Sequence, residues 1–188
     1  ITVVCGRNNS GKTYATYALY GFLKTWKSLV DLKINEKPIE TLCTTGHTKI
    51  NLESIWRDRA KIVQEGCQKF SRFLPQVLAS NEDLLKNASF EIDFTCENNW
   101  KAKKILTSFK IKRFCSVKIA KEENSDVLDA ILVKENEKAD SLPVEIAADI
   151  LKDKIVQILF EGIFPEPYIA SAERTGAAIF LKELDFAR

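Results

Sequence analysis

The first residues of the chain combine residue types that bind phosphate groups. An apolar stretch, Ile1 to Cys5, precedes a loop of the form G-x-x-x-x-G-K-S/T, and an apolar segment follows it. Glycines let the backbone curl so that successive N–H groups face an anion, and the N-terminus of a following helix adds partial positive charge. The pattern therefore predicts a buried strand, a phosphate-binding loop and a helix. The loop residues are Gly6, Arg7, Asn8, Asn9, Ser10, Gly11, Lys12 and Thr13.

Two side chains of this loop have defined roles in phosphoryl transfer. Lys12 is expected to reach the β- and γ-phosphates of ATP, and the Thr13 hydroxyl is expected to bind Mg²⁺. We therefore predict ATP and Mg²⁺ as cofactors, Lys12 as the catalytic residue, Thr13 as the metal ligand and Gly6 to Thr13 as the nucleotide-binding segment. The alternative is a turn between a strand and a helix that binds nothing, but such a turn needs neither the second glycine nor the lysine.

Other catalytic chemistry has little support in the sequence. His47 is the only histidine, and its polar surroundings predict a solvated loop residue without partners. The five cysteines are widely spaced and form no C-x-x-C pair, so neither a zinc site nor a disulfide framework is indicated. Hydrolysis by a serine or cysteine nucleophile with a histidine base is therefore not predicted.

Length and composition indicate a soluble globular protein. The 188 residues are 45% hydrophobic and 29% charged, with a net charge of +2, so we expect one sizeable domain and no protein-wide basic field for nucleic acid. No apolar run approaches the roughly 20 residues that cross a bilayer, and no signal-peptide pattern is present. We predict a cytoplasmic protein with reduced thiols. Because the chain begins inside the predicted strand and contains no methionine, we expect flanking or internal residues to be missing.

The helix that follows the loop is the first element needed to position it. Apolar residues at three- and four-residue spacing predict a helix from Gly11 to about Leu29. Its tyrosines Tyr14, Tyr17 and Tyr20 are expected to pack against a sheet rather than to stack on a nucleotide base.

Two short strands and a long helix are predicted next. The strand-like fragments are 31–34 and 49–52. The helix is expected over 52–79, with Asn51 as its N-cap and Pro75 as its end or kink.

Residues 90–133 change to a period of two, which is typical of half-buried strands. We predict one strand at 90–96 and further antiparallel strands across 105–119 and at 127–133. Cations are frequent in this segment, and they are Lys101, Lys103, Lys104, Lys110, Lys112 and Arg113. They are expected either to guard the edge of the meander or to contact DNA or RNA phosphates.

The last part of the chain returns to helical spacing. Residues 134–142 are typical of a polar linker, and Pro143 opens a helix that is predicted for Val144 to about Glu161. A core strand that ends in a charged turn is expected at 168–176, and a last helix at 177–188.

Two distant stretches of the chain resemble the same protein family. One is the loop, in which Asn8 stands ahead of Ser10-Gly11-Lys12; the other is Tyr168-Ile169-Ala170-Ser171-Ala172-Glu173-Arg174-Thr175-Gly176. Together they are similar to bacterial AAA-family ATPases with ABC-type heads. This group is related to RecF, to the structural-maintenance-of-chromosomes (SMC) proteins and to OLD-type and Septu-type anti-phage ATPases. The resemblance covers both ends of the chain and hardly any of its middle.

The resemblance implies an α/β P-loop NTPase fold of the ABC-type, SMC-like head. Residues 1–188 would form the N-terminal portion of one head, with a P-loop lobe at 1–50, a helix and a β-rich insertion at 51–142, and a helix, a strand and the start of a helical arm at 143–188. Glu173 and Arg174 would lie near the nucleotide and sense Mg²⁺ and the γ-phosphate, or form dimer contacts. Equally, they can form a buried ion pair at the end of the strand.

The family's mechanism implies that two heads sandwich two ATP molecules. ATP-driven homodimerisation and hydrolysis would then gate a DNA-related or anti-phage defence function, through DNA or an effector protein. The sequence departs from the family because it shows neither a Walker B pattern, which is four apolar residues followed by Asp-Glu, nor an S-G-G-Q/E signature loop. The chain as given is therefore expected to bind nucleotide better than to hydrolyse it. The alternatives are a P-loop kinase or other nucleotide phosphotransferase, and a non-hydrolysing nucleotide-gated scaffold.

Overall fold

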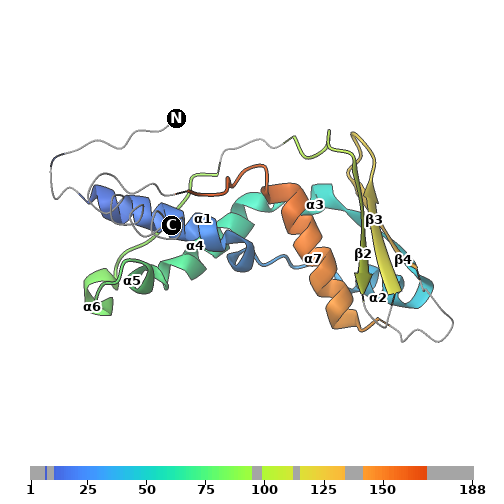
Figure 1. The fold of residues 1–188 in the computed structure, drawn as a ribbon, viewed down its shortest axis with the longest axis horizontal. Coiled ribbons are helices and arrows are strands. Elements are labelled where there is room, and N and C mark those ends of the chain that lie inside the picture. The colour runs from blue at the N-terminus through green and yellow to red at the C-terminus, as the bar shows by residue number, and fades with distance from the viewer. Residues whose placement is uncertain (1–6, 8–10, 95–98, 112–114, 134–141, 169–188) are drawn as a thin grey trace, which may run out of the picture.

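The computed structural model describes Arg7 and residues 11–94, 99–111, 115–133 and 142–168. Over these residues the protein has a helical part built on the helix Lys12–Leu29 and a four-stranded sheet at the opposite end, with the long helix Val144–Phe160 next to the sheet (Figure 1). The content is thus mixed α and β. The parallel sheet of a P-loop fold is not among the described residues, so that fold stays a prediction.

The elements follow one another in an irregular order of helices and strands. The helices are α1 (Lys12–Leu29), α2 (Glu36–Thr45), α3 (Leu52–Arg57), α4 (Arg59–Ser71), α5 (Leu74–Val77), α6 (Glu82–Leu85) and α7 (Val144–Phe160). The strands are β1 (His47–Asn51), β2 (Ile105–Ile111), β3 (Cys115–Lys121) and β4 (Val127–Val133). This confirms the predicted helices that begin near Gly11 and at Val144, and the strands predicted across 105–133.

The sheet has the strand order β1-β4-β3-β2, and every neighbouring pair is antiparallel. Strands β2, β3 and β4 form the predicted meander. Strand β1 comes from an earlier part of the chain and pairs along β4, with His47 opposite Ile131 and Asn51 opposite Val127. The fragment predicted at 49–52 is therefore a strand, and it joins the meander at the edge opposite β2.

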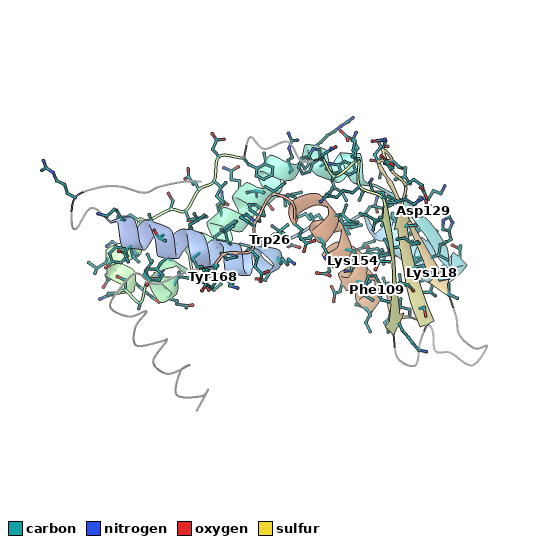
Figure 2. All side chains as sticks on the ribbon, turned by 45° about the horizontal axis from the view of Figure 1, so that its top comes forward. Trp26, Phe109, Lys118, Asp129, Lys154 and Tyr168 are labelled. Atoms are coloured by element: carbon teal, nitrogen blue, oxygen red, sulfur yellow. The ribbon has the colours of Figure 1, made fainter. Side chains whose placement is uncertain are left out.

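The two faces of the sheet have different environments. On the inner face, Val117, Ile119 and Leu128 are at most 1% exposed, because α7 and α2 pack on this side. Figure 2 shows Lys154 of α7 near Phe109 on the inner face, whereas Lys118 and Asp129 lie on the side away from α7. Side chains along each strand therefore alternate between a face that helices cover and a face that is exposed, as the period of two predicts.

Helix α1 packs against α4 and α5 through one stripe. The buried residues of this stripe are Ala18, Phe22, Trp26 and Leu29. The ring of Phe22 is fully buried, and its centroid lies 5.5 Å from that of Phe70, 5.0 Å from Phe90 and 5.6 Å from Phe164. This aromatic cluster joins α1, α4, the segment before β2 and the segment after α7.

The strand predicted at 31–34 is wrong, because these residues are unpaired and lead into α2. The Asn35 side-chain oxygen caps that helix and accepts a hydrogen bond from the Lys37 N–H at 3.2 Å. Sequence reasoning missed α2 because Pro38 suggests a break, yet a proline in the first turn of a helix removes no intrahelical hydrogen bond. Gly46, with φ 78°, ends α2 and turns the chain into β1.

The single helix predicted over 52–79 is also wrong, since the chain forms α3, α4 and α5 there. Its N-cap is confirmed, because the Asn51 side-chain oxygen accepts a hydrogen bond from the Ser54 N–H at 3.2 Å. Helix α4 ends four residues before Pro75, where the proline ring would clash with the carbonyl of the preceding turn. Pro75 itself lies in the first turn of α5, which needs no N–H from it.

The strand predicted at 90–96 is wrong for the part that is described. Residues 90–94 alternate in burial but pair with none of the described strands. Phe90 packs on Phe22 and Phe70, and Phe94 packs on Phe160. The period of two therefore comes from an extended segment that lies on helices.

Four predicted segments fall largely or wholly outside the described residues. They are the buried strand at 1–5, the linker at 134–142, of which only Leu142 is described, the strand at 168–176, of which only Tyr168 is described, and the helix at 177–188.

Candidate functional site

Helix α1 begins directly after Gly11. This residue is the N-cap and has φ 81° and ψ 6°, in the left-handed region that favours glycine. A β-carbon there would meet no atom within 4 Å, so the glycine is needed for backbone conformation and not for space. Its carbonyl accepts a helical hydrogen bond from the Ala15 N–H at 3.0 Å. The second glycine of the motif thus lets the chain turn from the loop into α1.

Lys12 folds back across the loop. Its Nζ donates a hydrogen bond to the carbonyl oxygen of Arg7 at 2.6 Å. The contact joins residues five positions apart and holds the ammonium at the loop end of α1, where the helix carries partial positive charge.

The first turn of α1 is suited to an anion. It contains no acidic residue, and the Gly11 N-cap makes no side-chain cap to its N–H groups. The Thr13 side chain in this turn is exposed. N–H donors, a lysine ammonium and a positive helix end therefore lie together, and these are the groups that bind phosphate.

The structure brings four of the predicted site residues together, namely Arg7, Gly11, Lys12 and Thr13. The others, Gly6, Asn8, Asn9, Ser10, Glu173 and Arg174, lie outside the described residues. Within the described ranges, no group of three or more His, Cys, Asp or Glu side chains can hold a metal ion. A Mg²⁺ ion at this loop would take the Thr13 hydroxyl as a protein ligand and the oxygens of phosphate and water beside it, a ligand set that suits Mg²⁺.

Comparison with known proteins identified no relative of this chain. No family model, no curated protein and no solved structure matches the chain. The likeness to ABC-type heads therefore rests on the two sequence stretches alone. Among the helices of the described residues, none combines the length and the apolar character of a membrane span.

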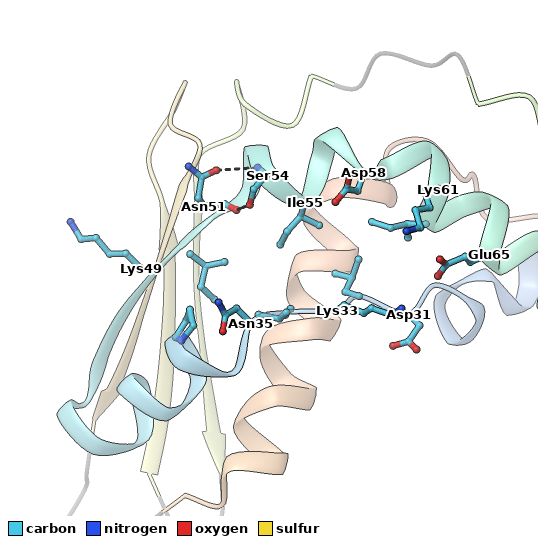
Figure 3. A pocket seen from close by; sticks show the side chains of 15 residues that line it. Asp31, Lys33, Asn35, Lys49, Asn51, Ser54, Ile55, Asp58, Lys61 and Glu65 are labelled. Atoms are coloured by element: carbon cyan, nitrogen blue, oxygen red, sulfur yellow. Dashed lines mark hydrogen bonds between the residues drawn. The ribbon is translucent and has the colours of Figure 1, made fainter.

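A second candidate site is a cavity of about 330 Å³ beyond the C-terminal end of α1 (Figure 3). Its walls come from residues 31–35, from β1, and from α3 and α4. The aliphatic lining consists of Leu32, Ile34, Ile50, Ile55 and Ile62, and the charged lining consists of Asp31, Asp58, Glu65, Lys33, Lys49 and Lys61. Because three acids balance three lysines, the lining favours neither an anion nor a cation.

His47 lies in β1 and not in a loop, so its predicted place is wrong. Its Nε2 lies 3.2 Å from an Asp129 carboxylate oxygen on the neighbouring strand β4, and Lys49 Nζ lies 3.8 Å from the same oxygen. The prediction that His47 has no partner is wrong as well. The pairing of β1 with β4 across about eighty residues of sequence gives the histidine its partner, and a local pattern cannot show such a contact.

The predicted lysine cluster is divided among several partners. Lys101 Nζ lies 2.7 Å from Glu53 of α3, and Lys104 Nζ lies 3.0 Å from Glu122. The hydrogen bond to Glu53 raises the pKa of Lys101. Since β2 is an edge strand, the cluster lies beside a sheet edge, which is the position that the predicted role of guarding the edge requires. Lys112 and Arg113 lie outside the described residues.

Sequence reasoning missed the buried Lys121 at the end of β3. Its side chain is 1% exposed, and its Nζ donates to the carbonyl oxygens of Lys101, Lys103 and Glu122 at 2.7, 2.8 and 3.1 Å. Burial lowers the pKa of its ammonium. The signal was present, because the alternation along β3 places Lys121 on the same face as Ile119.

Tyr14 and Tyr17 do not pack as predicted within the described residues, whereas Tyr20 is half-buried. Tyr14 and Tyr17 are 58% and 48% exposed. Their rings lie on the first two turns after the loop, away from the stripe that α4 and α5 cover.

Proposed function

We propose that the chain binds ATP and Mg²⁺ through residues 6–13 and is the nucleotide-binding part of an ABC-type, SMC-like ATPase head. One observation carries the proposal: a left-handed Gly11, a helix that starts at the next residue, and a Lys12 that folds back onto the Arg7 carbonyl. A phosphate-binding loop brings a glycine, a lysine and a helix N-terminus together at its C-terminal end in the same way.

In this function the described residues bind and orient the nucleotide. The N–H groups of the first turn of α1 donate to phosphate oxygens, and the Lys12 ammonium exchanges the Arg7 carbonyl for the β- and γ-phosphates. The Thr13 hydroxyl holds Mg²⁺, which neutralises charge on the phosphates. Glu173 and Arg174 act near the γ-phosphate or at the contact between two heads. Dimerisation of the heads gates a DNA-related or anti-phage function.

The test is a lysine variant with a control on the same helix. We expect Lys12→Ala to weaken ATP binding at least about tenfold, because it removes a charge-assisted contact to phosphate. Lys24→Ala changes an exposed lysine in the C-terminal half of α1, away from the loop, and should leave the affinity within about twofold. Titration calorimetry with Mg-ATP measures both, and circular dichroism checks that the helices are intact. An ATP affinity that Lys12→Ala leaves unchanged would remove the loop assignment.

A nucleotide-gated scaffold is the second candidate, because the sequence shows no Walker B carboxylate. Both candidates bind ATP, but only the ATPase releases phosphate. Phosphate release that Lys12→Ala abolishes supports the ATPase, and saturable binding without release supports the scaffold. Transfer of phosphate to an added nucleoside monophosphate would instead assign a kinase.

A further inference from the structure

Strand β2 forms one edge of the sheet. All seven of its residues pair with β3 on one side, and no described strand pairs with it on the other. The backbone N–H and C=O groups of a free edge are a template to which an extended segment can add as a further strand.

The inward side chains of β2 are incompletely covered. Thr107 and Phe109 are half-buried, whereas their partners on β3, Ile119 and Val117, are at most 1% exposed. Both pairs face α7, so the helix covers β3 fully and β2 only in part. A strand added beside β2 would bring apolar side chains against the partly covered residues Thr107 and Phe109.

A cavity of about 330 Å³ lies between β2 and α7. We call this cavity the groove. Its less polar wall consists of Ile105 and Thr107 of β2, Ile119 of β3 and Ile158 of α7. The other lining residues are Lys103, Lys154, Gln157 and Glu161. An added strand can therefore place every second side chain against the less polar wall, and its acidic side chains can approach Lys103 and Lys154.

The charges around this groove are mainly positive. Lys154 Nζ lies 4.6 Å from the centroid of the Phe109 ring and so points at β2, as Figure 2 shows. Lys103 precedes β2 and is exposed, so two lysines and one acid line the groove. The one acid among the lining residues, Glu161, lies 3.5 Å from Lys27. The groove therefore complements an acidic partner.

We propose that the edge of β2 and the adjoining groove bind an extended, acidic segment of a partner protein by strand addition. The backbone of the segment pairs with β2, its alternate apolar side chains enter the groove, and its acidic side chains meet Lys103 and Lys154. This binding site is separate from the nucleotide loop and does not depend on it.

A second copy of this chain fits the edge less well. Two β2 strands in antiparallel contact would place Lys103 of both copies along one short edge to which β2 contributes no acidic residue, and like charges there are destabilising. Nucleic acid also fits less well, because phosphates are recognised by cations and polar groups and make no use of an apolar wall.

A labelled seven-residue peptide of alternating glutamate and valine tests the proposal by fluorescence polarisation at physiological ionic strength. We expect saturable binding, and at least about tenfold weaker binding to Lys103→Glu and to Lys154→Glu. Lys118→Glu is the matched control, because it reverses an exposed lysine on the outer face of β3, and it should change the affinity less than twofold. The same peptide with N-methyl groups at alternate residues should not bind, since it cannot pair with the edge.

Three results would overturn the proposal. They are an absence of saturable peptide binding, an equal loss of affinity in Lys118→Glu and Lys154→Glu, and full binding by the N-methylated peptide. Duplex DNA that displaces the peptide and loses affinity in all three lysine variants would identify a phosphate-binding surface and overturn the proposal as well. Thermal unfolding of each variant shows that the sheet is intact.

Discussion

Removing the Lys121 ammonium would leave three backbone carbonyls without their shared donor. We expect Lys121→Met to lower the free energy of unfolding by about 1–3 kcal/mol, because each carbonyl loses the hydrogen bond from the ammonium, although Lys101 and Glu122 keep a backbone N–H donor. Urea titration measures the change. Lys118→Met, on the exposed face of the same strand, is the control and should stay within about 0.5 kcal/mol of the wild type.

If Lys121→Met is as stable as the wild type, the hydrogen bonds only offset the cost of burying the ammonium. That result would contradict a net stabilising role for Lys121.

At the scale of single residues, sequence reasoning predicted conformation better than partners. The backbone bend at Gly11 and the N-cap at Asn51 were predicted correctly, because both depend on the local backbone. The partners of His47 and Lys121 could not be predicted, because they come from a neighbouring strand and from the segment before β2.

Two glycines inside helices differ in the space around them. A β-carbon on Gly21 of α1 would lie 2.8 Å from Val77 Cγ1 and 3.2 Å from the Phe70 ring. A β-carbon on Gly66 of α4 would lie 3.6 Å from the nearest atom, the Leu29 carbonyl oxygen, which is an ordinary contact. The same substitution therefore has opposite expected effects at the two sites.

We expect Gly21→Ala to lower the melting temperature and Gly66→Ala to raise it or leave it unchanged. Alanine in a helix interior gains about 1 kcal/mol over glycine, whereas overpacking costs about 1–3 kcal/mol. Thermal unfolding followed by circular dichroism measures both variants. A rise in melting temperature for Gly21→Ala would contradict the close approach of α1 to α5.

At the scale of elements, periodicity was reliable where its pattern was long and unbroken. The stripe of α7 and the meander were predicted with nearly correct bounds. Pro38 misled the prediction, because it occupies the first turn of a helix, whereas the end or kink predicted at Pro75 corresponds to the break between α4 and α5 just before it. The alternation at 90–94 misled it as well, because an extended segment on a helical layer has the same period as a strand.

At the scale of the whole molecule, the proposed function predicts a change of assembly. We expect saturating Mg-ATP to convert the monomer to a dimer in the full-length protein, because each nucleotide would bridge two heads. Light scattering after size exclusion measures the mass with and without nucleotide. Lys12→Ala should stay monomeric in both conditions. A wild-type protein that stays monomeric with bound ATP would contradict the head-sandwich mechanism.

The overall architecture was only partly accessible to sequence reasoning. Mixed α and β content and the antiparallel meander followed from local patterns. The pairing of β1 with β4 did not, since nothing local shows which distant strand completes a sheet. The ABC-type head and its boundaries at residues 50 and 142 stay predictions, because the stretches that suggested them lie mostly outside the described residues.

Helix α1 also has a mechanical consequence. Its 18 residues span about 27 Å, from the lysine of the loop to the segment that walls the cavity of Figure 3. A tilt of about 5° around the loop end would displace the far end by about 2 Å. Under the proposed function, a tilt of this size on phosphate binding would therefore change the position of one wall of the cavity.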